Sequence, residues 1–136
     1  MIILKAIKNF LVFFIIGGTG YALIEILWRG RTHWSMFTLG GICFNAFGKI
    51  AKIFNNMCLL YKSLIAVFFI TSAELIYGLI FNILLKKEIW DYSSIPFNFK
   101  GQICLLYSCF WWFLSLFFIP LANKLNNNLQ NHKKVL

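Results

Sequence analysis

The chain has 136 residues, of which 60% are hydrophobic and only 12% are charged, and its mean hydropathy is +0.76. A soluble domain has about 25% charged residues and buries only about two-thirds of its surface at this size, so the composition excludes an ordinary soluble protein. The formal net charge is +9, but the basic residues lie between apolar segments. We therefore expect contacts with anionic lipid headgroups rather than nucleic acid, and one transmembrane domain over residues 1–136.

Four apolar segments are long enough to cross the bilayer hydrocarbon, which takes about 20 helical residues. In chain order they are residues 10–28, 34–54, 63–85 and 101–121. The first follows Lys5 and Lys8 and so resembles a signal peptide, but its apolar run continues past a cleavage point and predicts a retained helix. Short connections make consecutive helices antiparallel neighbours. The predicted fold is an all-α membrane protein of two tandem helical hairpins, with a polar tail over residues 123–136.

The distribution of Lys and Arg predicts the orientation of these segments. The side with both termini has eight basic residues: Lys5, Lys8, Lys49, Lys52, Lys62, Lys124, Lys133 and Lys134. The opposite side has five: Arg29, Arg31, Lys86, Lys87 and Lys100. Because cytoplasmic loops carry an excess of basic residues, we expect cytoplasmic N- and C-termini in a multi-pass protein of the cell membrane.

Two glutamates within the apolar segments are the foremost candidate functional residues. An acidic residue at mid-bilayer costs about 2.5–3.5 kcal/mol on insertion scales and usually marks a substrate path or a paired partner. Glu74 lies near the middle of the third segment with no basic residue within one helical turn, which favours function. Glu25 precedes Arg29 by four residues, so an interfacial ion pair and a function are both open for it. The predicted polar path comprises Glu25, Asn45, Glu74, Asn82 and Gln102.

Small and polar residues recur at intervals of three or four in these segments, for example Gly41, Asn45 and Gly48 in the second. This spacing places them on one helix face. Small residues let helices approach closely in a membrane, so packing is the favoured interpretation for the Gly, Ser and Thr members.

The connections after the first and third segments form a second candidate site, rich in the aromatic residues typical of a membrane interface. This outer-face motif comprises Arg29, His33, Trp34, Ser35, Trp90, Asp91, Tyr92 and Asn98. Interfacial anchoring and function are both open for it. A glutamate-bearing segment precedes each connection and an Ile-Cys pair follows each, which indicates an internal repeat with both connections on one face of the protein.

Metal, cofactor and enzyme chemistry find no support in the sequence. The four cysteines have no CxxC or Cys/His metal spacing. Glu25, His33 and Asp91 are candidates for an intramembrane enzyme, but no nucleophile, metal triad or phosphate loop accompanies them. We therefore expect no enzyme activity and assign no catalytic residue, no metal ligand and no cofactor.

Several motifs carry a resemblance to a known family. In the first half they are IEILWRG (24–30), THWSMF (32–37) and LGGICF (39–44), and in the second half WDYS (90–93), PFN (96–98) and GQICL (101–105). These motifs resemble the signature of the bacterial CmpB-type family, labelled Putative ABC-transporter type IV, which includes the animal transmembrane protein 229 group. The resemblance covers roughly residues 10–121 and implies a small multispanning protein named as a transporter. The sequence has no P-loop for ATP.

These observations predict a transporter or channel component for a small solute or ion. Four helices rarely enclose a pore alone, so we expect a homo-oligomer or another membrane subunit as a partner within the lipid bilayer. The alternative is a non-transporting scaffold, lipid-binding or regulatory membrane protein whose aromatic outer face binds a lipid or a partner.

Overall fold

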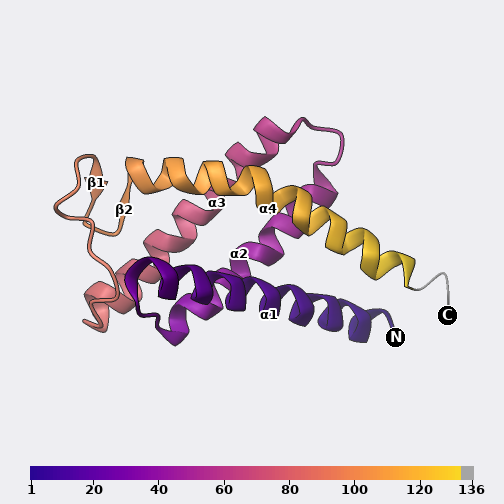
Figure 1. The fold of residues 1–136 in the computed structure, drawn as a ribbon, viewed down its shortest axis with the longest axis horizontal. Coiled ribbons are helices and arrows are strands. Elements are labelled where there is room, and N and C mark those ends of the chain that lie inside the picture. The colour runs from indigo at the N-terminus through magenta and orange to yellow at the C-terminus, as the bar shows by residue number, and fades with distance from the viewer. Residues whose placement is uncertain (133–136) are drawn as a thin grey trace.

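The computed structural model describes residues 1–132 and is mostly helical (Figure 1). The helices are α1 (Ile2–Arg29), α2 (Trp34–Ile53), α3 (Leu59–Tyr77) and α4 (Leu105–Asn131). A π-helical segment, η1 (Gly78–Leu84), continues α3. Two short strands, β1 (Asn98–Phe99) and β2 (Ile103–Cys104), pair antiparallel before α4. The helical class is confirmed, and the small β-hairpin is an addition to it. Lys133 and Lys134 of the charge count lie outside the described residues.

Three helical stretches are long and apolar enough to cross a membrane. They are Ile2–Arg29, Leu59–Leu84 and Leu105–Asn131, and the most apolar 18 residues of each have mean hydropathies of 2.1, 2.2 and 1.8. α2 is present where a fourth span was predicted, but it is less apolar. Its lower apolarity follows from its position in the fold. α2 packs against α1, α3 and α4, and more than half of its residues are buried. Its glycine and polar residues therefore contact protein, where small and polar side chains are favoured.

The connections after α1 and after η1 lie side by side. The guanidinium of Arg29 at the end of α1 donates a hydrogen bond from Nη1 to the carbonyl oxygen of Ile89, over 2.8 Å. Both connections lie toward the left end in Figure 1, whereas the N-terminus and the last turns of α4 lie toward the right end. This placement agrees with the prediction that the two connections share one face.

Glycines bring α1 and α2 into close contact. A Cβ atom built on Gly17 would lie 2.6 Å from the carbonyl oxygen of Gly40, and one built on Gly40 would lie 2.8 Å from that of Gly17. Beside this contact, Asn45 Nδ2 donates to the carbonyl oxygens of Phe10 (3.2 Å) and Gly41 (3.0 Å). The contact supports the packing interpretation of the small residues, because close backbone approach leaves no room for a side chain.

Polar side chains join α3 to α4. Trp112 Nε1 donates to Ser63 Oγ over 2.9 Å, and the hydroxyl oxygens of Thr71 and Ser108 lie 3.4 Å apart. In hydrocarbon such groups must find partners within the protein, so these bonds set how α4 is rotated against α3.

The helices extend beyond the predicted segments at both ends of the chain. α1 begins at Ile2 rather than at residue 10, and α4 continues to Asn131, so residues 123–131 of the predicted polar tail are helical. The fourth segment was expected from residue 101, but α4 begins at Leu105 because residues 98–104 form the β-hairpin. Gly101 has a φ of +69°, which a helix does not accommodate. Within this segment, Asn98 Nδ2 donates to the Ile95 carbonyl (2.8 Å) and Asn98 Oδ1 accepts from Gly101 N (3.0 Å), so Asn98 stabilises the turn.

Substitution of Gly17 by Ala tests the close contact of α1 and α2. The new Cβ would lie 2.3 Å from Phe44 Cβ, and overpacking of this kind costs about 1–3 kcal/mol. We expect Gly17→Ala to lower the midpoint of thermal unfolding in detergent, measured by fluorescence-detected size exclusion. Gly20→Ala on the same helix is the matched control, because a Cβ there meets nothing within 4 Å. Equal midpoints for the two variants would contradict the contact.

Candidate functional site

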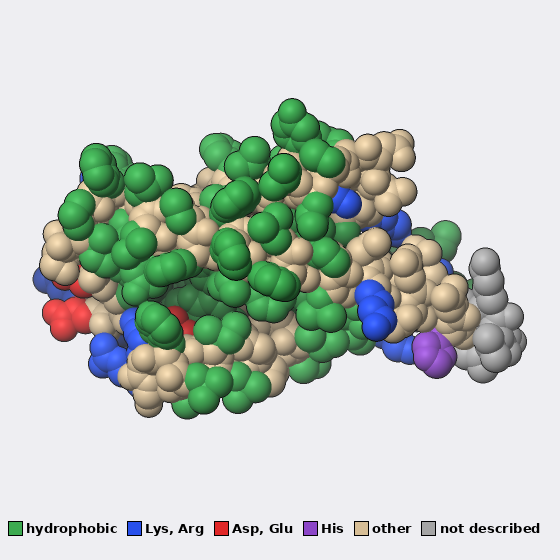
Figure 2. Space-filling view, turned by 45° about the horizontal axis from the view of Figure 1, so that its top comes forward, with side chains coloured by type: hydrophobic (Ala, Val, Ile, Leu, Met, Phe, Trp, Pro, Cys, Tyr) green, Lys and Arg blue, Asp and Glu red, His purple; other side chains and the backbone are tan. Residues whose placement is uncertain are grey.

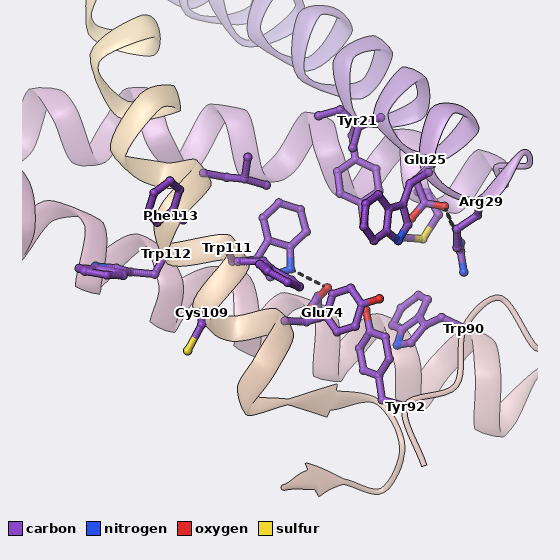
Figure 3. Close-up of a pocket in the computed structure, with 16 residues that line it drawn as sticks. Tyr21, Glu25, Arg29, Glu74, Trp90, Tyr92, Cys109, Trp111, Trp112 and Phe113 are labelled. Atoms are coloured by element: carbon purple, nitrogen blue, oxygen red, sulfur yellow. Dashed lines mark hydrogen bonds and ion pairs between the residues drawn. The ribbon is translucent and has the colours of Figure 1, made fainter. Parts of the chain in front are cut away.

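A cavity of about 770 Å³ lies between α1, α4, the end of α3 and the segment after η1. Figure 3 shows its side chains converging from these elements. α1 contributes Tyr21, Glu25 and Arg29, and α3 contributes Glu74. The remaining lining is largely aromatic, and includes Trp90 and Tyr92 from the connection and Tyr107, Phe110, Trp111, Trp112 and Phe113 from α4. The volume and the mostly apolar lining are typical of a small-molecule site.

The rim of the cavity is apolar and exposed. Ile24 and Trp28 of α1 are 42% and 73% exposed, and Phe110 and Phe113 of α4 are 47% and 60% exposed. Figure 2 shows the hollow among hydrophobic side chains, with atoms of an acidic side chain visible beside it in red. This exposed rim lies on two helices, α1 and α4, that have the length and apolarity of membrane spans.

Glu74 lies at the inner wall of this cavity. Its residue is only 3% exposed, and its Oε1 accepts a hydrogen bond from Trp111 Nε1 over 2.9 Å. Within residues 1–132, its Oε2 accepts no hydrogen bond. No fully enclosed side-chain nitrogen or oxygen in this part of the chain lacks a partner, so Oε2 is not sealed off and borders the cavity. Glu74 was predicted to lack a basic partner on its own helix. Among the described residues, it also forms no ion pair with a basic residue from any other part of the chain.

Glu25 and Arg29 form the ion pair that their spacing predicted. Arg29 Nε donates to Glu25 Oε2 over 3.1 Å, and Nη2 donates to the same oxygen. The guanidinium also donates to the Ile89 carbonyl, so its donors are directed at groups within the protein. Arg29 therefore compensates the charge of Glu25 and leaves Glu74 without a counter-charge in the cavity.

Tyr92 and Tyr107 form one aromatic wall. Their ring centroids lie 4.5 Å apart with an interplanar angle of 12°. Burial raises the pKa of the Tyr92 phenol well above its usual range, and the nearby carboxylate of Glu74 raises that pKa further. Tyr92 therefore lines the cavity as a neutral side chain.

The three amide residues of the predicted polar path do not line the cavity and instead make hydrogen bonds that hold the fold together. Asn45 lies at the α1–α2 contact and does not line the cavity. Asn82 Nδ2 donates to Gln102 Oε1 over 2.8 Å, and Asn82 Oδ1 accepts from the backbone N–H of Ile89 over 2.7 Å. The carbonyl oxygen of Gln102 accepts from Trp90 Nε1 over 2.9 Å. Asn82 and Gln102 thus position the connection behind the cavity, and only the two glutamates of the path reach its lining.

The outer-face motif divides in a similar way. Arg29, Trp90 and Tyr92 line the cavity. His33 is the N-cap of α2, because its Nδ1 accepts from the backbone N–H of Ser35 over 3.2 Å, and Ser35 Oγ lies 2.7 Å from the same nitrogen.

The other members of the motif lie outside the cavity lining. Trp34 is 65% exposed, and Asn98 stabilises the turn described above. Asp91 Oδ1 accepts from Ser93 N over 2.9 Å, and hydrogen bonds from Ser93 lower the pKa of this exposed carboxyl. Of the three candidates for an enzyme site, Glu25 lines the cavity, whereas His33 and Asp91 do not.

The aromatic residues of α1 and α4 that line the cavity were not among the predicted site residues. Trp111 is the donor to Glu74, and its ring stacks on Tyr21 of α1 with centroids 5.5 Å apart and an angle of 10°. One signal was available, since two indole N–H groups in an apolar span need acceptors. The serine and the carboxylate of the third segment are such acceptors.

Comparison with known proteins identifies one family. Residues 10–136 match the model of the family described as Putative ABC-transporter type IV (CmpB type), which confirms the resemblance carried by the motifs. A search of curated proteins and a search of solved structures gave no match. The family match and the three apolar helices indicate a multi-pass membrane protein. The chain belongs to the Putative ABC-transporter type IV family.

Proposed function

We propose that this chain is a membrane component of a transporter for a small solute or ion, with the aromatic cavity as its solute site. The observation that carries the proposal is the convergence of Glu25 and Glu74, from different helices, on one cavity in which Glu74 has an oxygen without a donor. Buried ionisable residues in membrane proteins commonly mark a substrate or ion path. The family description supports the same class of function.

Binding and passage, rather than catalysis, are the proposed use of the cavity. Its charged groups are two carboxylates and one guanidinium, of which Glu25 and Arg29 already compensate each other. The cavity opens at one side between α1 and α4, so we propose that a second copy or another membrane subunit completes the path across the cell membrane.

Substitution of Glu74 by Gln tests the proposal. The amide keeps the shape of the side chain and its acceptor for Trp111 but removes the charge. In proteoliposomes, uptake of a panel of labelled anionic, neutral and cationic solutes should show at least one solute that enters faster than into protein-free liposomes. We expect Glu74→Gln to slow that uptake at least tenfold, because a solute that uses the carboxylate loses its partner.

Glu88→Gln is the matched control for this flux measurement. Glu88 is exposed and lies outside the cavity lining, so its variant should transport like the unmodified chain. The proposal fails if no solute distinguishes the unmodified chain from empty liposomes, or if Glu74→Gln transports as fast as Glu88→Gln.

We further propose that α2 crosses the membrane as the fourth span of two tandem hairpins, with both termini in the cytoplasm. Support comes from the excess of basic residues on the side of the termini and from the side-by-side connections at the other end.

Cysteine labelling tests this topology. Cys58 is exposed in the connection between α2 and α3, and Ser94 is exposed in the connection after η1. In intact cells, with the other cysteines replaced by Ala, a membrane-impermeant maleimide should label Ser94→Cys and should label Cys58 only after permeabilisation. The reverse pattern, or labelling of both sites from one side, would contradict the topology.

The alternative function is lipid binding without transport. The exposed apolar rim of the cavity favours it, because a lipid in the bilayer could enter sideways between α1 and α4. Binding of a lipid that is not accompanied by any flux would support this alternative over a transporter.

A further inference from the structure

We propose that the cavity binds a lipophilic organic monocation, one whose charge is surrounded by apolar groups as in a quaternary ammonium or phosphonium ion. This inference rests on the proposed solute site and specifies its ligand class. Three features of the cavity carry it: the apolar mouth, the uncompensated carboxylate and the aromatic faces beside that carboxylate.

The mouth selects for lipophilic ligands. Ile24, Trp28, Phe110 and Phe113 form its rim, and all four are more than 40% exposed on helices that have the length and apolarity of membrane spans. A strongly hydrated ion would have to lose its water before it reached this rim, at a large cost in free energy. An ion with its charge buried among alkyl or aryl groups is weakly hydrated and enters hydrocarbon far more easily.

The charges of the cavity select for a cation. Its lining holds Glu25, Arg29 and Glu74, and the first two form an ion pair. With both carboxylates ionised, the lining has a net charge of −1 that belongs to Glu74. A buried carboxylate without a counter-charge is costly, so a bound cation gains the attraction that the protein leaves unused. An anion would meet Glu74 directly, and the guanidinium that could attract it is engaged with Glu25 and the Ile89 carbonyl.

Aromatic faces lie where the apolar groups of such a cation would pack. The stacked pair of Tyr21 and Trp111 adjoins Glu74, because Trp111 donates the hydrogen bond to its carboxylate. The stacked pair of Tyr92 and Tyr107 lies on the side of the connection. Aromatic faces attract cations through the ring quadrupole, and several of them around one site recognise quaternary ammonium groups. The volume of about 770 Å³ is large enough for an ion with several such substituents.

Equilibrium dialysis of the purified full chain in detergent tests the ligand class, with empty micelles as the background. The probes are tetraphenylphosphonium, the anion tetraphenylborate of the same shape, and neutral triphenylphosphine oxide. We expect saturable binding of the phosphonium alone. Binding should weaken at least tenfold in Glu74→Gln and remain unchanged in Glu88→Gln, which removes an exposed carboxylate outside the cavity.

A second measurement keeps the test valid if Glu74→Gln does not fold. Cys109 is exposed and lines the cavity, whereas Cys58 is exposed and lies in the α2–α3 connection. Tetraphenylphosphonium should slow the reaction of Cys109 with N-ethylmaleimide at least threefold in the unmodified chain and leave Cys58 unaffected. Equal slowing of both cysteines, or protection by the borate as strong as that by the phosphonium, would overturn the proposal.

The two proposals fail separately. Phosphonium binding that depends on Glu74 but is accompanied by no solute flux would sustain the ligand class and refute the transporter. Flux that depends on Glu74, together with equal binding of cation, anion and neutral probe, would sustain the transporter and refute the ligand class.

Discussion

In hydrocarbon, each polar group must find its partner within the protein, and this constraint organises the contact between α3 and α4. Trp112 donates to Ser63, and Trp111 donates to Glu74. Across residues 1–132, no fully enclosed side-chain nitrogen or oxygen lacks a hydrogen bond. Because the two indoles are neighbours in sequence and bind acceptors eleven residues apart on α3, they fix the rotation of α4. That rotation brings the aromatic face of α4 to the cavity.

The contact between α1 and α2 has a different physical basis. Facing glycines allow the backbones to approach closely, and packing replaces hydrogen bonds as the main attraction. α2 also contacts α3 and α4, so it connects the two halves. The stacked rings of Tyr21 and Trp111 bridge α1 and α4. The cavity lies where large aromatic side chains, rather than glycines, line the space between α1 and α4.

The sequence predicted well what depends on local spacing and on the length of apolar segments. It placed the apolar helices, the pairing of Glu25 with Arg29, and the isolation of Glu74 from basic residues. It could not show that the two glutamates line the cavity whereas Asn45 does not. Spacing indicates which residues share a helix face, but not which part of the protein that face contacts. The partner of Glu74, Trp111, depends on the tertiary rotation of α4. The β-hairpin depends on a turn at Gly101 and on the hydrogen bonds of Asn98, which hydropathy does not report.

Under the proposed binding of a lipophilic ligand, the mouth between α1 and α4 determines which phase the cavity equilibrates with. Where this rim of exposed apolar residues contacts acyl chains, occupancy of the proposed site follows the mole fraction of ligand in the lipid rather than its aqueous concentration. A compound that partitions strongly into membranes can therefore fill the cavity at a low aqueous concentration with only modest intrinsic affinity. Added lipid volume dilutes such a ligand and empties the site, even when the amounts of protein and ligand stay constant.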